Sequence, residues 1–171
     1  MNQNAFLQLL RNALQAIQEP DCYSTEREYQ EEFLTQMRAR LDDDLIWPGA
    51  PAVEEEYQES AVVHGLEFRP DLIIHSHFER GLFEHRRQGD YVVIELKRHA
   101  SKQAAETAYA QLDRICSLLD YAMGIFINVD SDQVFFPEFS SRAGDRLHGF
   151  AVELRGGRVH LLESHPYQSR Y

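Results

Sequence analysis

One stretch of this chain combines a strong strand signal with two charges: Asp90–Lys97, which reads DYVVIELK. Its centre is an almost unbroken run of β-branched and aliphatic residues, which is typical of a strand covered on both faces. Because side chains alternate between the two faces of a strand, Glu95 and Lys97 project to the same side. The stretch therefore predicts a buried central strand that carries a carboxylate and an ammonium group at its end.

Two further strands are predicted upstream of this stretch, at residues 53–63 and 66–75. Both are short runs rich in β-branched residues, and the second reads LEFRPDLIIH. We expect the three strands to pair antiparallel in sequence order. The connection before the third strand carries Arg86 and Arg87.

The segments around these strands predict three helices and three more strands. Apolar residues recur at helical spacing in the helical segments, while a short apolar run and two alternating runs around a Gly-Gly pair are typical of strands. A strand followed by a long helix and a further strand predicts a crossover connection. In chain order we expect a helix over 4–18, a helix from Ser24 or Thr25 to about Leu41, the three strands, a helix over 101–121, a strand over 124–130, a loop over 131–149 and a hairpin around Gly156-Gly157.

This order of elements predicts an α/β fold with a mixed β-sheet flanked by helices. A chain of 171 residues with 43% hydrophobic side chains is typical of one globular domain, and it is long enough to bury a core of its own. The sequence contains no internal repeat, low-complexity tract or linker. We therefore expect a single domain over residues 1–171.

The charge balance narrows the function classes. The chain has 28 acidic and 17 basic side chains, a formal net charge of −11. This argues against a general nucleic-acid coat protein, which needs a broad basic field, but a nuclease can hold phosphates with a few local cations. Only two of the basic residues are lysines, Lys97 and Lys102, so a lysine at the end of the central strand is informative.

Cellular location is predicted from what the sequence lacks. Two cysteines form neither a disulfide framework nor a zinc site. The N-terminus does not follow the pattern of a signal peptide, and no apolar run reaches the roughly 18 residues of a membrane span. We therefore expect a soluble cytoplasmic protein with no membrane partner.

Three polar residues stand where the local pattern favours apolar ones: Asp71, Glu95 and Lys97. In an antiparallel hairpin, the start of one strand lies beside the end of the next, which brings these groups to one sheet edge. Burying such charges without partners is costly. Two carboxylates, a backbone carbonyl and waters form a hard-oxygen site suited to Mg²⁺ or Mn²⁺. We therefore expect a divalent metal site, in which the lysine positions the attacking water or stabilises the oxyanion.

Pro70-Asp71, followed after 23 intervening residues by Glu95-Leu96-Lys97, resembles the PD-(D/E)XK motif of the restriction-endonuclease-like nucleases. The core of that family is a helix, a three-stranded antiparallel meander, a helix and a strand, which matches residues 24–130 in order. The first helix and the C-terminal hairpin lie outside it. The resemblance implies a metal-dependent nuclease with DNA as the expected substrate. In it Asp71, Glu95 and the Leu96 carbonyl hold Mg²⁺ or Mn²⁺, and Lys97 positions the nucleophilic water.

Two further residues match features found in many members of that family. Glu26 is the best match for a Glu on the first core helix, because it lies on the inward stripe with Tyr29 and Phe33. Gln111 matches a Gln in a pattern resembling Q-L-x-R-Y on the later helix, although Ile115 replaces the Tyr. The resemblance implies that Glu26 and Gln111 support a second metal or the catalytic water.

Four basic residues are candidate nucleic-acid contacts. Arg98 and Lys102 follow the motif at the start of a helix, where backbone N–H groups also favour anions, and Arg86 and Arg87 lie in the preceding connection. Ordinary roles stay open throughout. The arginines and Lys102 are also compatible with ordinary solvated positions, and Gln111 with the surface of a helix. Glu95 and Lys97 could form an edge-strand ion pair, and Asp71 could be a turn residue. Glu26 could be a charge that complements a helix N-terminus.

A second functional hypothesis is a catalytically silent nuclease-fold module that binds or scaffolds a protein partner. The net charge of −11, the lack of a separate DNA-binding domain and a loop with Phe135, Phe136 and Phe139 favour it. The intact D…ExK pattern favours the nuclease, since a degenerate member has no reason to keep buried charges. By family analogy, a homodimer fits both hypotheses, because two subunits can cut both strands of a duplex.

Overall fold

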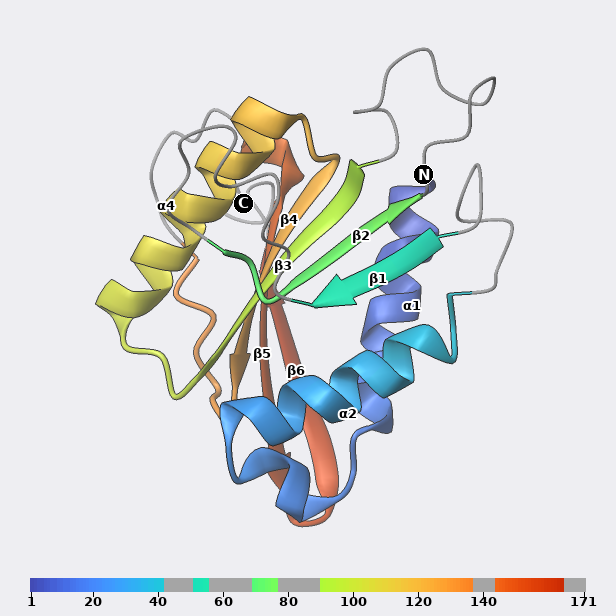
Figure 1. Ribbon diagram of the computed structural model, residues 1–171. Helices are drawn as coiled ribbons and strands as arrows, with labels where there is room; N and C mark the ends of the chain where they lie inside the picture. The colour runs from blue at the N-terminus through green and yellow to red at the C-terminus, as the bar shows by residue number, and fades with distance from the viewer. Residues whose placement is uncertain (42–50, 56–68, 77–89, 137–143, 165–171) are drawn as a thin grey trace.

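Six strands form one mixed sheet in the part of the chain that the computed structural model describes, residues 1–41, 51–55, 69–76, 90–136 and 144–164 (Figure 1). They lie in sequence order across the sheet: β1 Pro51–Glu55, β2 Leu72–Ser76, β3 Asp90–Arg98, β4 Met123–Val129, β5 Leu147–Arg155 and β6 Arg158–Ser164. The first three strands pair antiparallel, β4 and β5 continue parallel to β3, and β6 returns antiparallel. The predicted meander, crossover strand and terminal hairpin are confirmed.

The pairing register makes β3 project beyond β2. Leu72, the first residue of β2, pairs with Ile94, while β4 accompanies β3 to Arg98 on the other side. Residues 69–71 of the strand predicted over 66–75 do not join β2, because Pro70 has no N–H to donate to a ladder, and residues 66–68 lie outside the described part of the chain. The last residues of β3 therefore present an open edge where β2 has not yet begun.

Three α-helices and two short 3-10 helices accompany the sheet among the described residues. The bounds are α1 Gln3–Ala16, η1 Pro20–Tyr23, α2 Glu26–Arg38, α4 Lys102–Leu119 and η3 Gly144–Arg146. Each α-helix starts after a side chain that accepts a backbone N–H, namely Asn2, Thr25 or Ser101. The predicted helices are confirmed, and each ends two or three residues before its expected limit. The last helix stops where Asp120 takes a left-handed backbone, with φ of 60°.

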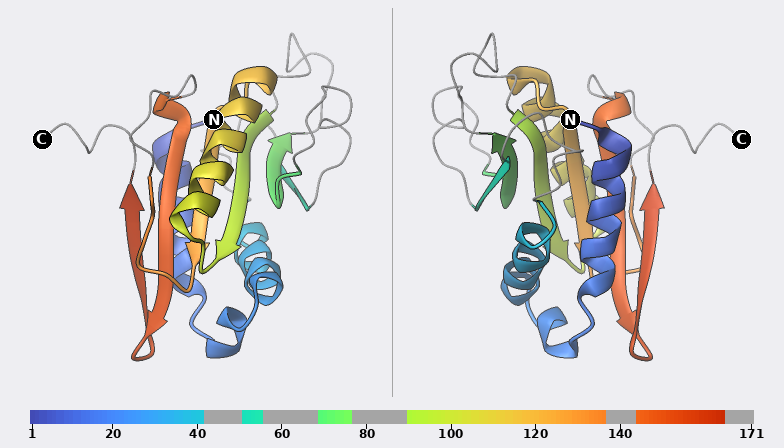
Figure 2. Two further views of the ribbon diagram at one scale, coloured as in Figure 1. Left: turned by 90° about the vertical axis from the view of Figure 1, so that its left-hand side faces the viewer. Right: turned by 90° about the vertical axis from the view of Figure 1, so that its right-hand side faces the viewer.

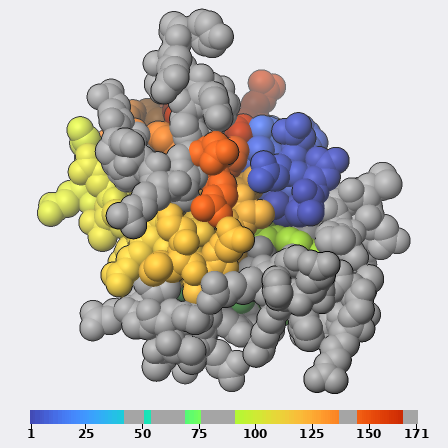
Figure 3. Space-filling model, turned by 90° about the horizontal axis from the view of Figure 1, so that it is seen from above, coloured from blue at the N-terminus to red at the C-terminus, as the bar shows by residue number. Residues whose placement is uncertain are grey.

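Helices cover both faces of the sheet. Figure 2 shows α4 in front of the sheet in one view and α1 in front of it in the opposite view, and Figure 3 shows α1 and α4 on two sides of the molecule. Alternate residues of β3 enter the two cores: Val93 packs with α4, whereas Ile94 and Leu96 pack with α1 and α2. Glu95 and Lys97 share the parity of Val93, so they belong to the α4 face.

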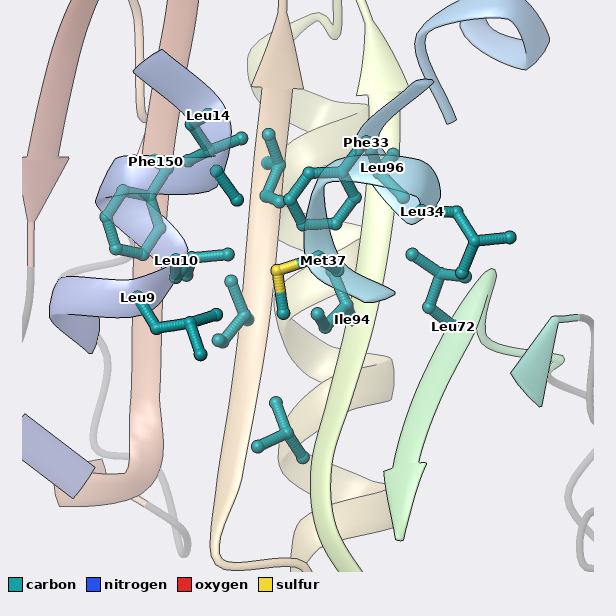
Figure 4. Packing of buried hydrophobic residues seen from close by; sticks show 14 of the residues in the cluster. Leu9, Leu10, Leu14, Phe33, Leu34, Met37, Leu72, Ile94, Leu96 and Phe150 are labelled. Atoms are coloured by element: carbon teal, nitrogen blue, oxygen red, sulfur yellow. The ribbon is translucent and has the colours of Figure 1, made fainter. Parts of the chain in front are cut away.

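The core between the sheet and the first two helices is fully apolar at its centre. Figure 4 shows Phe33 and Met37 of α2 beside Ile94 and Leu96 of β3, with Leu14 of α1 on the neighbouring part of the sheet. All five side chains have 0% exposure. Burying a side chain of this size contributes about 1.5–3 kcal/mol. This packing fixes α2 against β3, which determines where the start of α2 lies.

The C-terminal hairpin turns at Gly156-Gly157, where φ values of 60° and 73° lie in the left-handed region that favours glycine. β5 begins at Leu147 rather than after the predicted loop over 131–149, since Leu147 already pairs with Gly124 of β4. The remainder of the strand expected over 53–63 lies outside the described residues. Within the described ranges, no helix has the length and apolar character needed to cross a membrane.

Candidate metal centre

Two carboxylates occupy the open edge of β3. Asp71 Oδ2 accepts a hydrogen bond from the Leu96 backbone N–H at 2.7 Å, and Glu26 Oε2 accepts one from the Arg98 N–H at 2.9 Å. These two N–H groups lie two residues apart and face the same edge, so a longer β2 would have bound both. Buried backbone N–H groups require such partners. Two backbone N–H groups at the end of β3 therefore hold these two acidic side chains in place.

The Lys97 ammonium lies among oxygen atoms from four residues. Its Nζ is 2.8 Å from Glu95 Oε1 and 2.8 Å from the Leu96 carbonyl oxygen, which it donates to. It is also 3.5 Å from Glu26 Oε1 and 3.8 Å from Asp71 Oδ2. The structure thus brings together the predicted Asp71, Glu95, Leu96, Lys97 and Glu26. Three carboxylates and one carbonyl surround a single positive charge.

Burial determines the electrostatics of this cluster. The Glu95 side chain is 5% exposed, and its burial, reinforced by the nearby charge of Asp71, raises its pKa to about 7. Burial also raises the pKa of Asp71, against the opposing effects of the Leu96 N–H and Lys97. Burial alone would lower the pKa of Lys97, but the carboxylates, Glu95 foremost, outweigh it and raise that pKa. Lys97 is therefore held fully protonated.

The donor set fits a hard divalent cation. Among the described residues, no hydrogen-bond donor reaches Glu95 Oε2, which is buried. A buried carboxylate oxygen without a partner is unfavourable, and a cation would satisfy it. Carboxylate and carbonyl oxygens are the ligands that Mg²⁺ and Mn²⁺ prefer. Within the same residues, no three acidic, histidine or cysteine side chains are already arranged as a metal-binding group, and Lys97 lies between the carboxylates instead.

A cavity of about 400 Å³ opens between the end of β3 and the first half of α4. This volume is within the range of about 300–1,000 Å³ that is usual for small-molecule sites. Glu95 and Lys97 form one wall, and the rest is lined by the N-cap residue Ser101 and, from α4, by Gln103, Ala104, Thr107, Ala108 and Gln111. Gln111 is half-buried and shares this cavity with the cluster. The helix wall offers hydroxyl and amide groups next to the charged wall.

The candidate nucleic-acid contacts are placed differently from one another. Arg98 is 31% exposed, and its side chain donates to the Tyr23 carbonyl and to Asp130. Lys102 is 75% exposed and lies 3.8 Å from Glu106 one turn along α4. Arg86 and Arg87 lie outside the described residues. Contact with a phosphate stays a prediction for all four.

The phenylalanines that favoured a protein-binding module pack internally where they are described. Phe135 and Phe136 contact the core beneath α4, and the Phe136 ring is 5.0 Å from that of Tyr109. Phe139 lies outside the described residues. These contacts give Phe135 and Phe136 a role in the fold of this chain.

Sequence reasoning missed Asp130 and Tyr23. Asp130 follows β4 and contacts Arg98 and His99, while Tyr23 ends η1 and offers its carbonyl to Arg98. No motif marks either residue, because Tyr23 acts through its backbone and Asp130 follows a strand as many turn residues do. Their positions near the cluster depend on contacts between residues far apart in the chain.

Comparisons of this chain with protein-family models, with curated proteins and with solved structures each gave no match.

Proposed function

We propose that this chain is a metal-dependent nuclease with a restriction-endonuclease-like fold, which hydrolyses phosphodiester bonds of DNA. The observation that carries the proposal is the convergence of Asp71, Glu95, Glu26 and the Leu96 carbonyl on Lys97 Nζ. Three carboxylates around one lysine, with Glu95 and Lys97 in a cavity wall, are more than a surface ion pair requires. Such convergence favours a site built for a cation and a phosphate.

Asp71, Glu95 and the Leu96 carbonyl would hold Mg²⁺ or Mn²⁺. When bound, such a cation lowers the pKa of a water ligand and neutralises charge on the phosphate. Glu95 Oε2 supports this assignment, since it is a buried oxygen that accepts no hydrogen bond from the described part of the chain, on a residue that lines the cavity. The raised pKa of Glu95 means that binding requires the loss of a proton near neutral pH.

The remaining residues would act on the water and the substrate. Lys97 presents N–H donors to the attacking water or to the developing oxyanion. Glu26, held by the Arg98 N–H, would orient that water or support a second cation. Gln111 lines the cavity from α4, and its amide suits a contact with the water or with the nucleic-acid backbone.

The element order supports the fold assignment within the proposal. From α2 to β4 the chain runs helix, antiparallel meander, helix and parallel strand, which is the order of the restriction-endonuclease-like core. The acidic residue before β2 and the Glu-x-Lys at the end of β3 meet at adjacent strand ends, as that fold requires. The additional α1 and the β5–β6 hairpin extend the sheet and cover one face.

The test is cleavage of end-labelled single-stranded and double-stranded DNA and RNA with Mg²⁺ or Mn²⁺. We expect Glu95→Gln and Lys97→Met each to lower the rate by at least about 100-fold, since each removes a group that stabilises transition-state charge. Matched controls are Glu31→Gln and Arg27→Met, because both residues are exposed on α2, at 60% and 88%. These controls should retain wild-type activity. Equal cleavage by all five proteins would identify a contaminant and overturn the proposal.

A further inference from the structure

Strands β3 and β4 end together, and the residue after each takes a left-handed backbone. Arg98 pairs with Val129 at the end of the ladder, and the following residues, His99 and Asp130, have φ values of 51° and 54°. The His99 N–H donates to the Val129 carbonyl at 3.0 Å. Left-handed backbone is uncommon for residues other than Gly and persists where surrounding contacts hold it. This corner is therefore a fixed feature of the fold.

The Asp130 carboxylate binds two side chains at this corner. Asp130 Oδ2 lies 2.9 Å from Arg98 Nη2 and 3.1 Å from His99 Nε2. The same Arg98 guanidinium donates through Nε to the Tyr23 carbonyl at 2.7 Å. Because the guanidinium is planar, one carboxylate on Nη2 fixes the direction of the Nε donor as well. Asp130 thus aims Arg98 at η1.

Arg98 reaches the start of α2 in two ways. Its side chain holds Tyr23, the last residue of η1, and its backbone N–H holds Glu26, the first residue of α2. Glu26 is 40% exposed and lies 3.5 Å from Lys97 Nζ. A half-exposed carboxylate gains little from one ion pair in water. Its place in the cluster therefore depends on the framework that holds α2 against β3.

We infer that Asp130 and Arg98 are positioning residues that fix the third carboxylate, Glu26, beside Lys97. The inference rests on the proposed function in one respect, the role of Glu26 near the cation. Asp130 acts through Arg98, and Arg98 acts through the η1–α2 junction and its own N–H. Neither positioning role requires contact with the substrate.

The first test is amide hydrogen exchange of the metal-free protein, followed by NMR. Removing the Asp130 side chain in Asp130→Gly, which suits the left-handed backbone, should accelerate exchange of the Arg98 N–H by about tenfold, as expected for one lost hydrogen bond. The Leu96 N–H provides the internal control, because Asp71 holds it on the same strand. Its exchange should stay unchanged, and Asp130→Asn should give an intermediate effect. Asp132→Gly, in the same turn, is the matched control.

The second test is Mn²⁺ affinity, measured by calorimetry, in a double-mutant cycle with Glu26→Gln. If Asp130 acts through Glu26, Asp130→Gly weakens binding in the wild-type background and has little further effect beside Glu26→Gln. Additive weakening in both backgrounds, or acceleration of both the Leu96 and Arg98 amides, would show a general structural role and overturn the inference. No acceleration at Arg98 would also overturn it.

The two proposals fail in different ways. If the wild-type protein binds no Mn²⁺ and cleaves no nucleic acid, the proposed function is overturned. The amide measurement needs no metal and still decides whether Asp130 positions Glu26. Conversely, the protein could bind metal and cleave nucleic acid while Asp130→Gly leaves the exchange rate of the Arg98 N–H unchanged. That result would support the proposed function and overturn this inference.

Discussion

Lys97 Nζ and Glu95 Oε1 lie 2.8 Å apart at the end of β3, on two residues that share one face of the same strand. Asp71, directly before β2, and Glu26 of α2 bring two more carboxylates to this pair, at 3.8 Å and 3.5 Å from Nζ. The ammonium therefore takes the central position among the oxygens that would bind a cation. This relationship makes the stability of the protein depend on pH and on Lys97 in predictable directions.

We expect the metal-free protein to lose stability as pH rises from about 5 to 8. The pKa of Glu95 is raised from 4.5 to about 7 in the folded state, so the native state binds more protons than the unfolded state between these values. Stability from this group is fully present below its unfolded pKa and is lost by about pH 7. The loss should amount to roughly 1–3 kcal/mol. Urea unfolding in EDTA across this range measures it.

The control for the pH effect is Glu95→Gln, which cannot titrate. Its stability should vary less between pH 5 and 8 than that of the wild type. The raised pKa of Asp71 acts in the same direction and leaves a residual slope. A wild-type protein that gains stability over this range would contradict the electrostatics described here.

Replacing Lys97 with Met should destabilise the metal-free protein and strengthen Mn²⁺ binding. Without the ammonium, three carboxylates repel one another, and the half-buried position suggests a cost of about 1–3 kcal/mol. A cation then meets no competing positive charge. The thermal shift produced by saturating Mn²⁺ should therefore be larger for Lys97→Met than for the wild type. A smaller shift in the variant would mean that Lys97 does not compete for this position.

Gly149 is predicted to be intolerant of any side chain. A Cβ at this position on β5 would collide with the Tyr109 hydroxyl and with Val134 Cγ1, and Tyr109 donates to the Val134 carbonyl at 3.1 Å. Gly149→Ala should lower the free energy of unfolding by about 1–3 kcal/mol, as overpacking does. Tyr109→Phe in the same chain should recover part of this loss, because it removes the colliding oxygen. Chemical denaturation of the wild type and these two variants tests both statements.

The first helix should dock on the last strand through a bidentate ion pair. Arg11 Nε and Nη2 donate to the two carboxylate oxygens of Glu163 on β6, at 2.8 Å and 3.0 Å. Such paired geometry is stronger than an ordinary surface contact, so Arg11→Met should cost about 1 kcal/mol. Salt should reduce the difference between the wild type and this variant. An unchanged midpoint of unfolding at low salt would show that α1 is held by apolar packing alone.

Local patterns were sufficient to predict most elements. The four-residue spacing of Tyr29, Phe33, Met37 and Leu41 predicts one buried stripe, and all four side chains are buried. The unbroken apolar run before Glu95 predicts a central strand, and β3 lies between β2 and β4. These properties follow from periodicity within a segment, which needs no knowledge of the partner segment. The start of β5 was missed, because Gly149 is typical of a loop until Tyr109 packs over it.

The sequence by itself determined that Asp71, Glu95 and Lys97 lie close together in the candidate site. Glu95 and Lys97 must share a face, and an antiparallel hairpin must bring Asp71 near them. Only the tertiary structure decided that Glu26 reaches Lys97 and that Arg98 turns towards Tyr23 and Asp130. Strand alternation and hairpin pairing are local rules, whereas the position of α2 follows from the packing of its apolar stripe on β3, across more than 70 residues of intervening chain. No spacing in the sequence encodes the position of α2 on the sheet, because it arises from the shapes of the side chains that meet in the core.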